Sequence, residues 1–479
     1  MTDRRLPFDP STREGLSTRW LQSDRIVPRR VVRPVQTFLD TEIGGAVLLL
    51  AASVAALVWA NSAWSPWYEG LWETRLTIGV GRWAISEDLR HWVNDLLMAL
   101  FFFVVGLEIK REAAFGDLRH PQTAALPIVA ALGGMALPAA LYLALNTGGP
   151  ATKGWGVPMA TDIAFALGAL ALLGRRAPQR LRMFLLTLAI VDDIGAIVVI
   201  AAFYTEHLSL TWLAAAIAGL GLIVVAQRLA IRTLVLYVLA AGFVWFATYS
   251  SGVHATIAGV ALGLLAPTRP FHQPDAVAEV VVDQLKPVRA TDDPPDEEER
   301  QDDESGEQAL RAVSRLAQEA VSPLARFEDK LHRWSSYLVL PLFALANAGV
   351  VVSGDFLAHG PARRVALGVI AGLVLGKPLG IAGACWLAVA SGRARLPAGV
   401  GWRQIIGGGA LAGIGFTVSL FIGGLAFTDP VLVNAAKTGI LTASLLAGLL
   451  GLLWLRFATS AAQSADAAQQ TSGDRAAED

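Results

Sequence analysis

The sequence predicts an all-α polytopic membrane protein with twelve transmembrane helices. Of its 479 residues, 54% are hydrophobic and only 16% are charged, and the mean hydropathy of +0.50 is too high for a soluble globule. Runs of about 20 residues with few or no charges recur along the chain, and a helix of this length crosses a bilayer. The single cysteine, Cys385, lies in such a run, so a disulfide framework and a cysteine-based metal cluster are both excluded. The formal net charge of -1 indicates no nucleic-acid partner.

The apolar runs define the spans in chain order. We predict them at 42–62, 90–108, 121–145, 155–173, 181–204, 209–227, 233–250, 252–266, 335–353, 365–390, 402–427 and 431–455. The larger polar segments are an Arg-rich tail at 1–40, a loop at 267–333 that divides the membrane domain into 41–266 and 334–457, and a disordered tail at 458–479.

The basic residues indicate the orientation of these spans. Twelve helices put both termini on one side of the membrane. With a cytoplasmic N-terminus, 31 of the 39 Lys and Arg residues fall in cytoplasmic segments and 7 in external ones, while Lys377 lies within a span. The positive-inside rule therefore predicts that both termini, and the 267–333 loop, are cytoplasmic.

Three segments depart from the pattern of apolar spans. The stretch "LTIGVGRWAIS" (76–86) alternates around a Gly-Arg turn and predicts a small β-hairpin over 73–86 on the outer surface. Residues 292–308 hold ten acidic residues and one Arg, which predicts a disordered linker. Apolar residues at near-helical spacing then predict an amphipathic helix leading into the ninth span: Leu310, Val313, Leu316, Val321, Leu324, Phe327 and Leu331.

Four charged residues lie well inside the predicted spans. Asp192 and Asp193 are adjacent in the fifth span, "LLTLAIVDDIGAIVVIAAF", whereas Lys377 is in the tenth and Asp162 in the fourth. An ionised residue at the centre of a membrane helix costs about 2.5–3.5 kcal/mol, so such residues are rarely retained without a role or a partner. Three acids and one base at similar depth predict an ion site.

The adjacent carboxylates suggest the chemistry of that site. Successive helical residues point about 100° apart, so one carboxylate lines a cavity while the other faces a partner helix. Two carboxylates this close cannot both ionise freely, and a proton or a bound cation relieves their repulsion. Hard carboxylate oxygens hold either protons or a small hard cation such as Na⁺ or Li⁺, and each displaces the other. The alternative is a buried Asp192–Lys377 pair that only joins two helices, which leaves Asp193 unpaired.

Two spans carry signals for a break inside the membrane. The fourth contains Gly156, Pro158 and the pair Thr161-Asp162 before an apolar run, which is typical of the N-cap of a half-helix. The eleventh is the Gly-rich "GGGALAGIGFTVSLFIGG", although glycine in a span also serves close helix packing. Two broken helices indicate inverted repeats of spans three to five and ten to twelve. Asp162 and Lys377 have suitable signs to offset the partial charges of the half-helix ends.

Seven motifs follow one another along the chain and point to a family. They are "FFFVVGLEIKRE" (101–112), "ATDIAFALGALALLG" (160–174), "LAIVDDIGAIVVIAAFYT" (188–205), "SGVHATIAGV" (251–260), "LPLFALANAGV" (340–350), "AGLVLGKPLGI" (371–381) and "GIGFTVSLFIGGLAF" (413–427). Because these motifs occur in the same order as in the family, the sequence resembles the NhaA family of sodium/proton antiporters over residues from about 40 to 457.

The resemblance implies a secondary active antiporter of the bacterial inner membrane that exchanges cytoplasmic Na⁺ or Li⁺ for external H⁺ by alternating access. It implies that Asp192 and Asp193 bind the cation and the proton, that Lys377 is the partner of Asp192, and that Thr161 and Asp162 lie at the helix crossing. It also implies a homodimer through the external hairpin and activation at alkaline pH. Exchange of two H⁺ for one Na⁺ would be electrogenic. We expect no enzymatic activity and no cofactor.

The resemblance extends to a cytoplasmic pH-responsive group, with one departure. The group is matched at Glu108, Arg111, Glu112, Glu328 and His332. A position that is often His in the family is Asp329 here, which leaves the pH set-point open. His254 titrates in the working range, although a lone His between two spans is more often structural.

Other functional classes lack their own motifs or requirements. Neither Gly-x-Gly-Asp nor HExxH is present, which argues against an intramembrane aspartyl or zinc protease. A passive cation channel would not need carboxylates that titrate. A K⁺/H⁺ antiporter or a sodium/solute symporter stays open, because the same site chemistry serves both.

Overall fold

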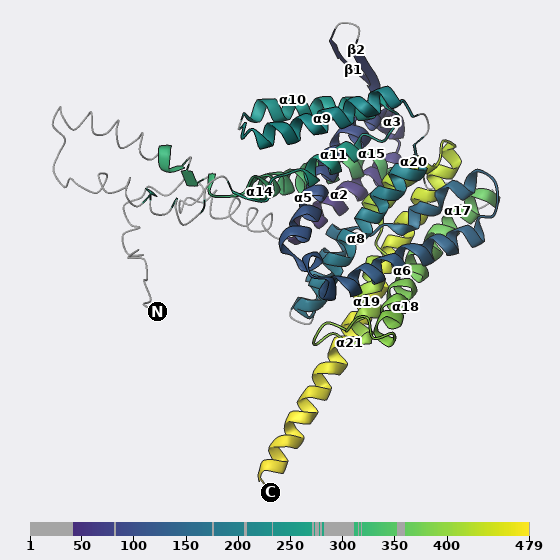
Figure 1. Cartoon of the computed structure of the whole chain (residues 1–479). Coiled ribbons are helices and arrows are strands. Elements are labelled where there is room, and N and C mark those ends of the chain that lie inside the picture. Colours follow the sequence, from purple (N-terminus) through teal and green to yellow (C-terminus); the bar gives the residue numbers. More distant parts are fainter. Residues whose placement is uncertain are drawn as a thin grey trace, which may run out of the picture.

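In the part of the chain that the structure describes, the fold is a bundle of helices with one small pair of strands (Figure 1). The computed structural model describes residues 42–80, 83–174, 177–205, 208–231, 233–270, 273, 277, 280–281, 311–314, 316–317, 319–351 and 360–478, and only the backbone at 42, 43, 80, 83 and 459–478. The Arg-rich tail at 1–40 and the acidic linker at 292–308 therefore lie outside the described residues.

The helices follow the order of the predicted spans. Up to the 267–333 loop they are α2 Glu42–Ala60, α3 Ser65–Trp72, α4 Leu89–Trp92, η4 Val93–Leu97, α5 Met98–Phe115, η5 Asp117–Arg119, α6 Pro121–Leu145, η6 Pro150–Met159, α7 Ile163–Leu172, α8 Gln179–Phe203, α9 Leu210–Arg228, α10 Leu234–Ser250 and α11 Thr256–Leu264. The later ones are α14 Pro323–Trp334, η9 Ser335–Val339, α15 Leu340–Asn347, α17 Gly360–Ala371, η10 Gly372–Gly376, α18 Lys377–Ala390, α19 Trp402–Ala412, α20 Phe416–Ala426 and α21 Pro430–Glu478.

Length and apolar composition identify a membrane-embedded protein. Among the described residues, 6 helices alone could cross a membrane, or up to 9 if each of three bent pairs counts as one span. Two of these pairs, η6/α7 and α19/α20, bend by 43° and 47° where the sequence predicts breaks. The third pair, α2/α3, bends by 116°, which the sequence pattern did not indicate. The helix α10 has 17 residues and α11 has 9, so the count of twelve spans stays a prediction.

Several boundaries differ from the prediction for local reasons. The helix α11 begins at Thr256, not at 252, because Gly252 adopts a positive φ of 81° just after α10. The ninth span was predicted to reach 353, but α15 ends at Asn347. The predicted amphipathic helix restarts at Pro323 as α14, where Ser322 is the N-cap and proline favours the first turn. The helix α21 continues to Glu478 through the predicted disordered tail, where alanine-rich sequence favours helix.

The strands β1 (Arg75–Val80) and β2 (Trp83–Asp88) occupy the segment for which the hairpin is predicted. They pair antiparallel, with Arg75 opposite Asp88, and project beyond α3 at one end of the bundle (Figure 1). Two side chains attach them to helices, since Trp92 Nε1 donates to the Leu76 carbonyl at 2.9 Å and Tyr249 donates to Glu87 at 2.8 Å. These contacts supply the support that an isolated two-stranded ribbon lacks.

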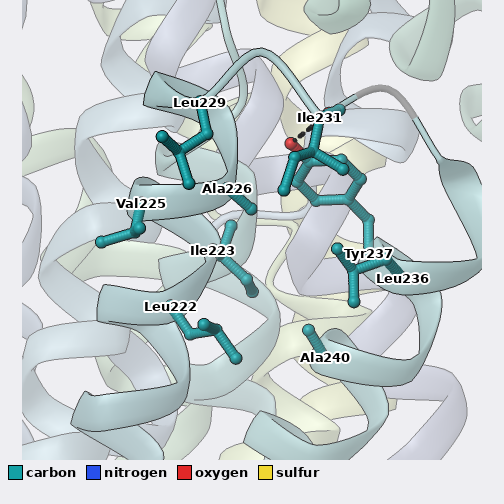
Figure 2. A pocket seen from close by; sticks show the side chains of 9 residues that line it. All are labelled: Leu222, Ile223, Val225, Ala226, Leu229, Ile231, Leu236, Tyr237 and Ala240. Carbon is teal, nitrogen blue, oxygen red and sulfur yellow. Dashed lines mark hydrogen bonds between the residues drawn. The ribbon is translucent and has the colours of Figure 1, made fainter.

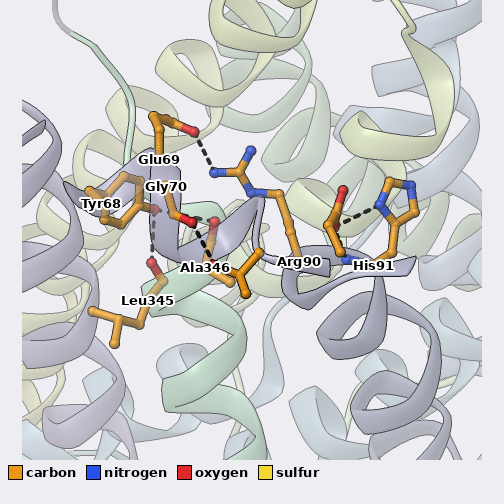
Figure 3. Close-up of polar contacts among 9 residues, drawn as sticks. Tyr68, Glu69, Gly70, Arg90, His91, Leu345 and Ala346 are labelled. Carbon is orange, nitrogen blue, oxygen red and sulfur yellow. Dashed lines mark hydrogen bonds and ion pairs between the residues drawn. The ribbon is translucent and has the colours of Figure 1, made fainter. Parts of the chain in front are cut away.

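A polar network joins three helices at the hairpin end of the bundle (Figure 3). The Tyr68 hydroxyl on α3 lies 2.8 Å from the carbonyl of Leu345 and 3.2 Å from that of Ala346, at the end of α15. Arg90 on α4 donates to Glu69 on α3 at 2.9 Å. The sharp bend between α2 and α3 is therefore stabilised by contacts to α4 and α15.

The helices α9 and α10 lie side by side at one edge of the bundle (Figure 1). Only 22% of the most apolar stretch of α9 is buried inside the protein. Figure 2 shows an apolar pocket between the two helices, lined by Leu222, Ile223, Val225, Ala226, Leu229, Ile231, Leu236, Tyr237 and Ala240. Its one polar side chain, Tyr237, donates to the Ile231 carbonyl at 2.8 Å, so the pocket suits hydrocarbon and not an ion.

Candidate ion-binding site

The candidate site lies where α8 meets the two broken pairs and the helix that carries Lys377. Asp192 and Asp193 are in the middle of α8, and their exposed fractions are 0% and 2%. Lys377 at the start of α18 is also 0% exposed. The structure thus brings together charged residues from segments that are far apart in the sequence.

Lys377, Asp192 and Thr161 form a hydrogen-bonded triangle. The ammonium of Lys377 donates to Asp192 Oδ2 and, at 2.9 Å, to the Thr161 hydroxyl. The Thr161 hydroxyl lies 2.6 Å from Asp192 Oδ2 and 2.9 Å from the Ala412 carbonyl at the end of α19. A hydroxyl has one proton, so it donates to one of these two acceptors at a time. Thr161 therefore links the Asp192–Lys377 pair to the broken pair α19/α20.

Asp162 caps two half-helices at once. It is the N-cap of α7, where Oδ1 accepts the N–H of Phe165 at 3.1 Å. Its Oδ2 accepts both the N–H of Thr417, at 3.0 Å, and the Thr417 hydroxyl, at 2.7 Å, in the first turn of α20. A carboxylate is favourable at a helix N-terminus because the free N–H groups carry partial positive charge. One buried acid thus serves both half-helices at the crossing.

Two carboxylate oxygens at the site have no hydrogen-bond partner among the described residues. They are Oδ1 of Asp192 and Oδ1 of Asp193, and both are buried. The charged groups that act on Asp193 are the carboxylates of Asp192, Glu108 and Asp162 and the ammonium of Lys377. Buried polar atoms are normally paired, so these oxygens are suited to a proton or a cation. The described part of the chain has no group of three or more His, Cys, Asp or Glu arranged to hold a metal ion.

The candidate pH-responsive residues lie mostly between α5 and α14. Arg111 donates to Glu328 at 2.5 Å, and His332 Nδ1 lies 3.6 Å from Glu108 Oε1. The Phe103 and Phe327 rings also pack at 6.3 Å between their centroids. The charged end of α5 is therefore joined to the helix that leads into α15.

The remaining candidates of this kind lie apart from that interface or at its edge. Glu112 Oε1 accepts the N–H of Asp117 at 2.7 Å, next to η5. Asp329 is exposed on α14. His254 Nε2 lies 2.7 Å from the Tyr204 carbonyl, so its ring joins the α10–α11 turn to the end of α8.

The structure adds two polar residues that the sequence pattern had not singled out. Thr417 follows the glycines of the eleventh span, and only the fold shows that it bonds to Asp162. Lys437 falls near the start of the predicted span at 431–455, and in the structure it lies inside α21 and is only 7% exposed. A single Lys within the apolar run "VNAAKTGIL" is the same signal that pointed to Lys377.

Comparison with known proteins identifies the family. Residues 36–455 match the family model described as Na+/H+ antiporter 1. The chain belongs to the NhaA family of Na⁺/H⁺ antiporters. It is similar to Na(+)/H(+) antiporter NhaA 2 of Sorangium cellulosum, with 45% identity over 436 residues that cover 90% of this chain and 91% of the relative.

Other NhaA relatives match to the same extent. The Na(+)/H(+) antiporter NhaA of Oleidesulfovibrio alaskensis is 46% identical over 427 residues, covering 89% of this chain and 94% of the relative. The Na(+)/H(+) antiporter NhaA 3 of Frankia alni is 48% identical over 427 residues, covering 89% of each chain. The match spans both predicted halves of the membrane domain, so the NhaA resemblance covers the whole candidate site.

Proposed function

We propose that this chain is a secondary active antiporter that exchanges cytoplasmic Na⁺ or Li⁺ for external H⁺ by competition at Asp192 and Asp193. The observation that carries the proposal is the pair of buried carboxylate oxygens without a hydrogen-bond partner among the described residues. A cation and protons are alternative ways to compensate these oxygens, and each excludes the other. The names of the NhaA relatives support Na⁺ and H⁺ as the two ions.

Each side chain of the site has a distinct role in this proposal. Asp193 is the principal cation ligand, because Lys377 already pairs with Asp192. Asp192 holds a proton or the ammonium of Lys377 when no cation is bound. Thr161 donates to Asp192 or to the Ala412 carbonyl, and so responds to the charge on Asp192. Asp162 is not a cation ligand in this proposal, because both of its carboxylate oxygens accept hydrogen bonds from the N-terminal turns of the half-helices α7 and α20.

The two broken pairs would provide alternating access. In inverted-repeat transporters the site lies between discontinuous helices, and one bundle rocks against the other around it. The bends of η6/α7 and α19/α20 and their shared cap at Asp162 support this assignment. We propose that spans three to five and ten to twelve are the two repeats.

We also propose that the exchange is electrogenic, with two H⁺ for one Na⁺. If one cation displaces two protons, each cycle moves one net charge. The membrane potential then contributes about 2.3 kcal/mol per 100 mV to Na⁺ expulsion. Imposing a potential on proteoliposomes should change the exchange rate. Exchange that neither generates a potential nor responds to one would contradict this stoichiometry.

The setting of the protein is part of the same proposal. We propose a location in the bacterial inner membrane with both termini cytoplasmic, a homodimer formed through the external β1–β2 hairpin, and regulation by cytoplasmic pH. The α5–α14 interface, with Arg111–Glu328 and His332–Glu108, supports the last point because it places titratable groups beside a helix that enters the bundle.

A vesicle assay tests the exchange directly. Purified protein in proteoliposomes with an internal pH dye receives Na⁺, Li⁺ or K⁺ in turn, and protein-free liposomes serve as the control. We expect Na⁺ and Li⁺ to drive proton movement and K⁺ to drive little. A response to K⁺ alone would favour a K⁺/H⁺ antiporter. Sodium uptake that requires an added solute and moves no protons would favour a symporter.

A further inference from the structure

The helix that carries Lys377 changes pitch directly before this residue. The segment Gly372–Gly376 (η10) is a π-helix between α17 and α18, and the N–H of Lys377 donates to the Gly372 carbonyl five residues back. A π turn adds one residue to an α-helix, and such turns recur at functional sites. Lys377 is the first residue after the turn, so the register of the turn decides where its side chain points.

The turn takes the α-helical donor away from one backbone carbonyl. The N–H of Lys377, which would serve the Leu373 carbonyl in an α-helix, donates to Gly372 instead, and the next residue, Pro378, has no N–H. This carbonyl faces the break between α19 and α20. A Cβ on Gly413 would collide with it, so glycine is needed there for the close approach.

Glycines at both ends of the turn pack against prolines of neighbouring elements. A Cβ on Gly372 would come within 2.6 Å of Pro158 Cβ in η6. A Cβ on Gly376 would come within 2.8 Å of Pro138 Cα in α6. The π turn therefore lies against three elements. They are the half-helix η6, the helix α6 and the break between α19 and α20. A movement of these elements relative to one another acts directly on the turn.

We propose that this π turn positions Lys377, and that its conversion to the α register during transport withdraws the ammonium from Asp192. The inference rests on the proposed antiport function. A shift by one residue rotates Lys377 by about 100° and moves it by about 1.5 Å along the helix axis. This rotation is enough to remove the ammonium from the Asp192 carboxylate and leave both acids to the cation.

Pro378 affects the hydrogen bonding of both registers. In the π register the N–H of Lys377 serves Gly372, and Pro378 has no N–H with which to serve Leu373. In the α register Leu373 would accept the N–H of Lys377, whereas the Val374 carbonyl lacks its i+4 donor in either register because that donor would be Pro378. The α register therefore pairs one more carbonyl than the π register. The Lys377–Asp192 pair and the packing of the glycines stabilise the π register against this gain, so loss of the pair favours the α register.

Deletion of Leu375 tests the switch. Its side chain is exposed, and removing one residue from a π turn gives a continuous α-helix with both flanking segments in place. Lys377 would stay against Asp192 without a second register. In proteoliposomes we expect the maximal rate of Na⁺/H⁺ exchange to fall at least about tenfold while the KM for Na⁺ changes less than about threefold, since binding is kept and movement is lost.

A second pair of variants decides the question if the deletion variant does not fold. Gly376→Ala crowds Pro138 and displaces the turn, whereas Gly383→Ala lies in the same helix with nothing within 4 Å of the added Cβ. We expect Gly376→Ala to lower the maximal rate by about tenfold and Gly383→Ala to match the unmodified protein, with the KM for Na⁺ little changed in both.

The outcomes separate this inference from the antiport function itself. If the unmodified protein shows no Na⁺/H⁺ exchange, the proposed function fails. If it exchanges, and the Leu375 deletion or Gly376→Ala exchanges at the same maximal rate, the inference about the π turn is overturned. Loss of rate in Gly376→Ala together with equal loss in Gly383→Ala would also overturn it, because the effect would then be general to the helix.

Discussion

Two cation–carboxylate pairs in this chain have similar chemistry and opposite surroundings. In Lys377–Asp192 both side chains are 0% exposed, and in Arg90–Glu69 they are 28% and 44% exposed. A buried pair leaves an uncompensated charge when one partner is removed, which costs about 3–5 kcal/mol. A solvent-exposed pair contributes about 0–1 kcal/mol. The desolvated Lys377–Asp192 pair is therefore the one whose making and breaking can be coupled to transport, whereas the exposed Arg90–Glu69 pair is a local attachment of α3 to α4.

The most damaging change on the buried side should be Asp193→Asn. Neutralising this acid removes the principal proposed cation ligand without opening a cavity, so we expect exchange to be abolished while the protein still inserts in the membrane. Exchange by Asp192→Asn should also be severely reduced, because the competing proton site is lost. Dye-monitored exchange in proteoliposomes measures both variants. Full exchange by purified Asp193→Asn would contradict the site assignment.

A double-mutant cycle measures the buried pair itself. Lys377→Met leaves Asp192 charged and unpaired, and we expect a loss of about 3–5 kcal/mol in the free energy of unfolding. Adding Asp192→Asn should restore most of it, because the uncompensated charge is gone. Thermal unfolding of the detergent-solubilised protein gives the ranking of the three variants. Additive losses would show that the two side chains are not coupled.

Asp162 allows a comparison within the crossing. Asp162→Ala removes the acceptor for Phe165 and for both donors of Thr417, and hydrogen bonds to a charged group contribute about 1.5–3 kcal/mol each. We expect a loss of at least about 2 kcal/mol in stability together with slower exchange. Thr417→Val is the matched control, because it removes only the hydroxyl bond, one of the three, and should cost about 1.5 kcal/mol, less than Asp162→Ala. Equal thermal stability of the two variants would argue against a double cap.

The pH response should follow the α5–α14 interface and not the acidic linker. Glu328→Gln breaks the pair with Arg111, and we expect the pH midpoint of exchange to shift. Deleting residues 292–308 should preserve the maximal rate and shift the midpoint by less than about one unit, because exposed charges are screened within about 8–10 Å at physiological salt. Rates measured from pH 6 to 9 at two concentrations of inert salt, about 50 and 300 mM, test both points. Loss of turnover at every pH in a folded deletion variant would show that the linker is required.

The smallest effect is expected at the exposed pair. Glu69→Gln removes one charge of Arg90–Glu69 and should change stability by less than about 1 kcal/mol, with exchange unaltered. The same unfolding and exchange assays apply. A loss of exchange comparable to that of Asp192→Asn would contradict the conclusion that the buried pair is needed for exchange and the exposed pair is not.

Much of the fold was predictable because bilayer insertion acts on local composition. Apolar runs predicted helices at α6, α8 and α9 to within a few residues, since a helix is the structure that satisfies its own backbone in hydrocarbon. The alternating segment around 76–86 predicted the β1–β2 pair, and Gly156, Pro158 and Asp162 predicted the break before α7. The free-energy cost of a charge in hydrocarbon likewise made Asp192, Asp193 and Lys377, which lie in apolar runs, candidates for the ion site.

Other features had no local signal and were decided by the tertiary structure. The pairing of Lys377 with Asp192 depends on how α8 and α18 pack, and the double cap at Asp162 depends on Thr417 from a segment 255 residues away. The π turn before Lys377 cannot be read from periodicity, because its extra residue is held by contacts of Gly372 and Gly376 with Pro158 and Pro138. The sequence by itself determined which residues were too costly to place in hydrocarbon without a purpose. Only the packing of distant helices decided which of them meet, because each partner comes from a different span.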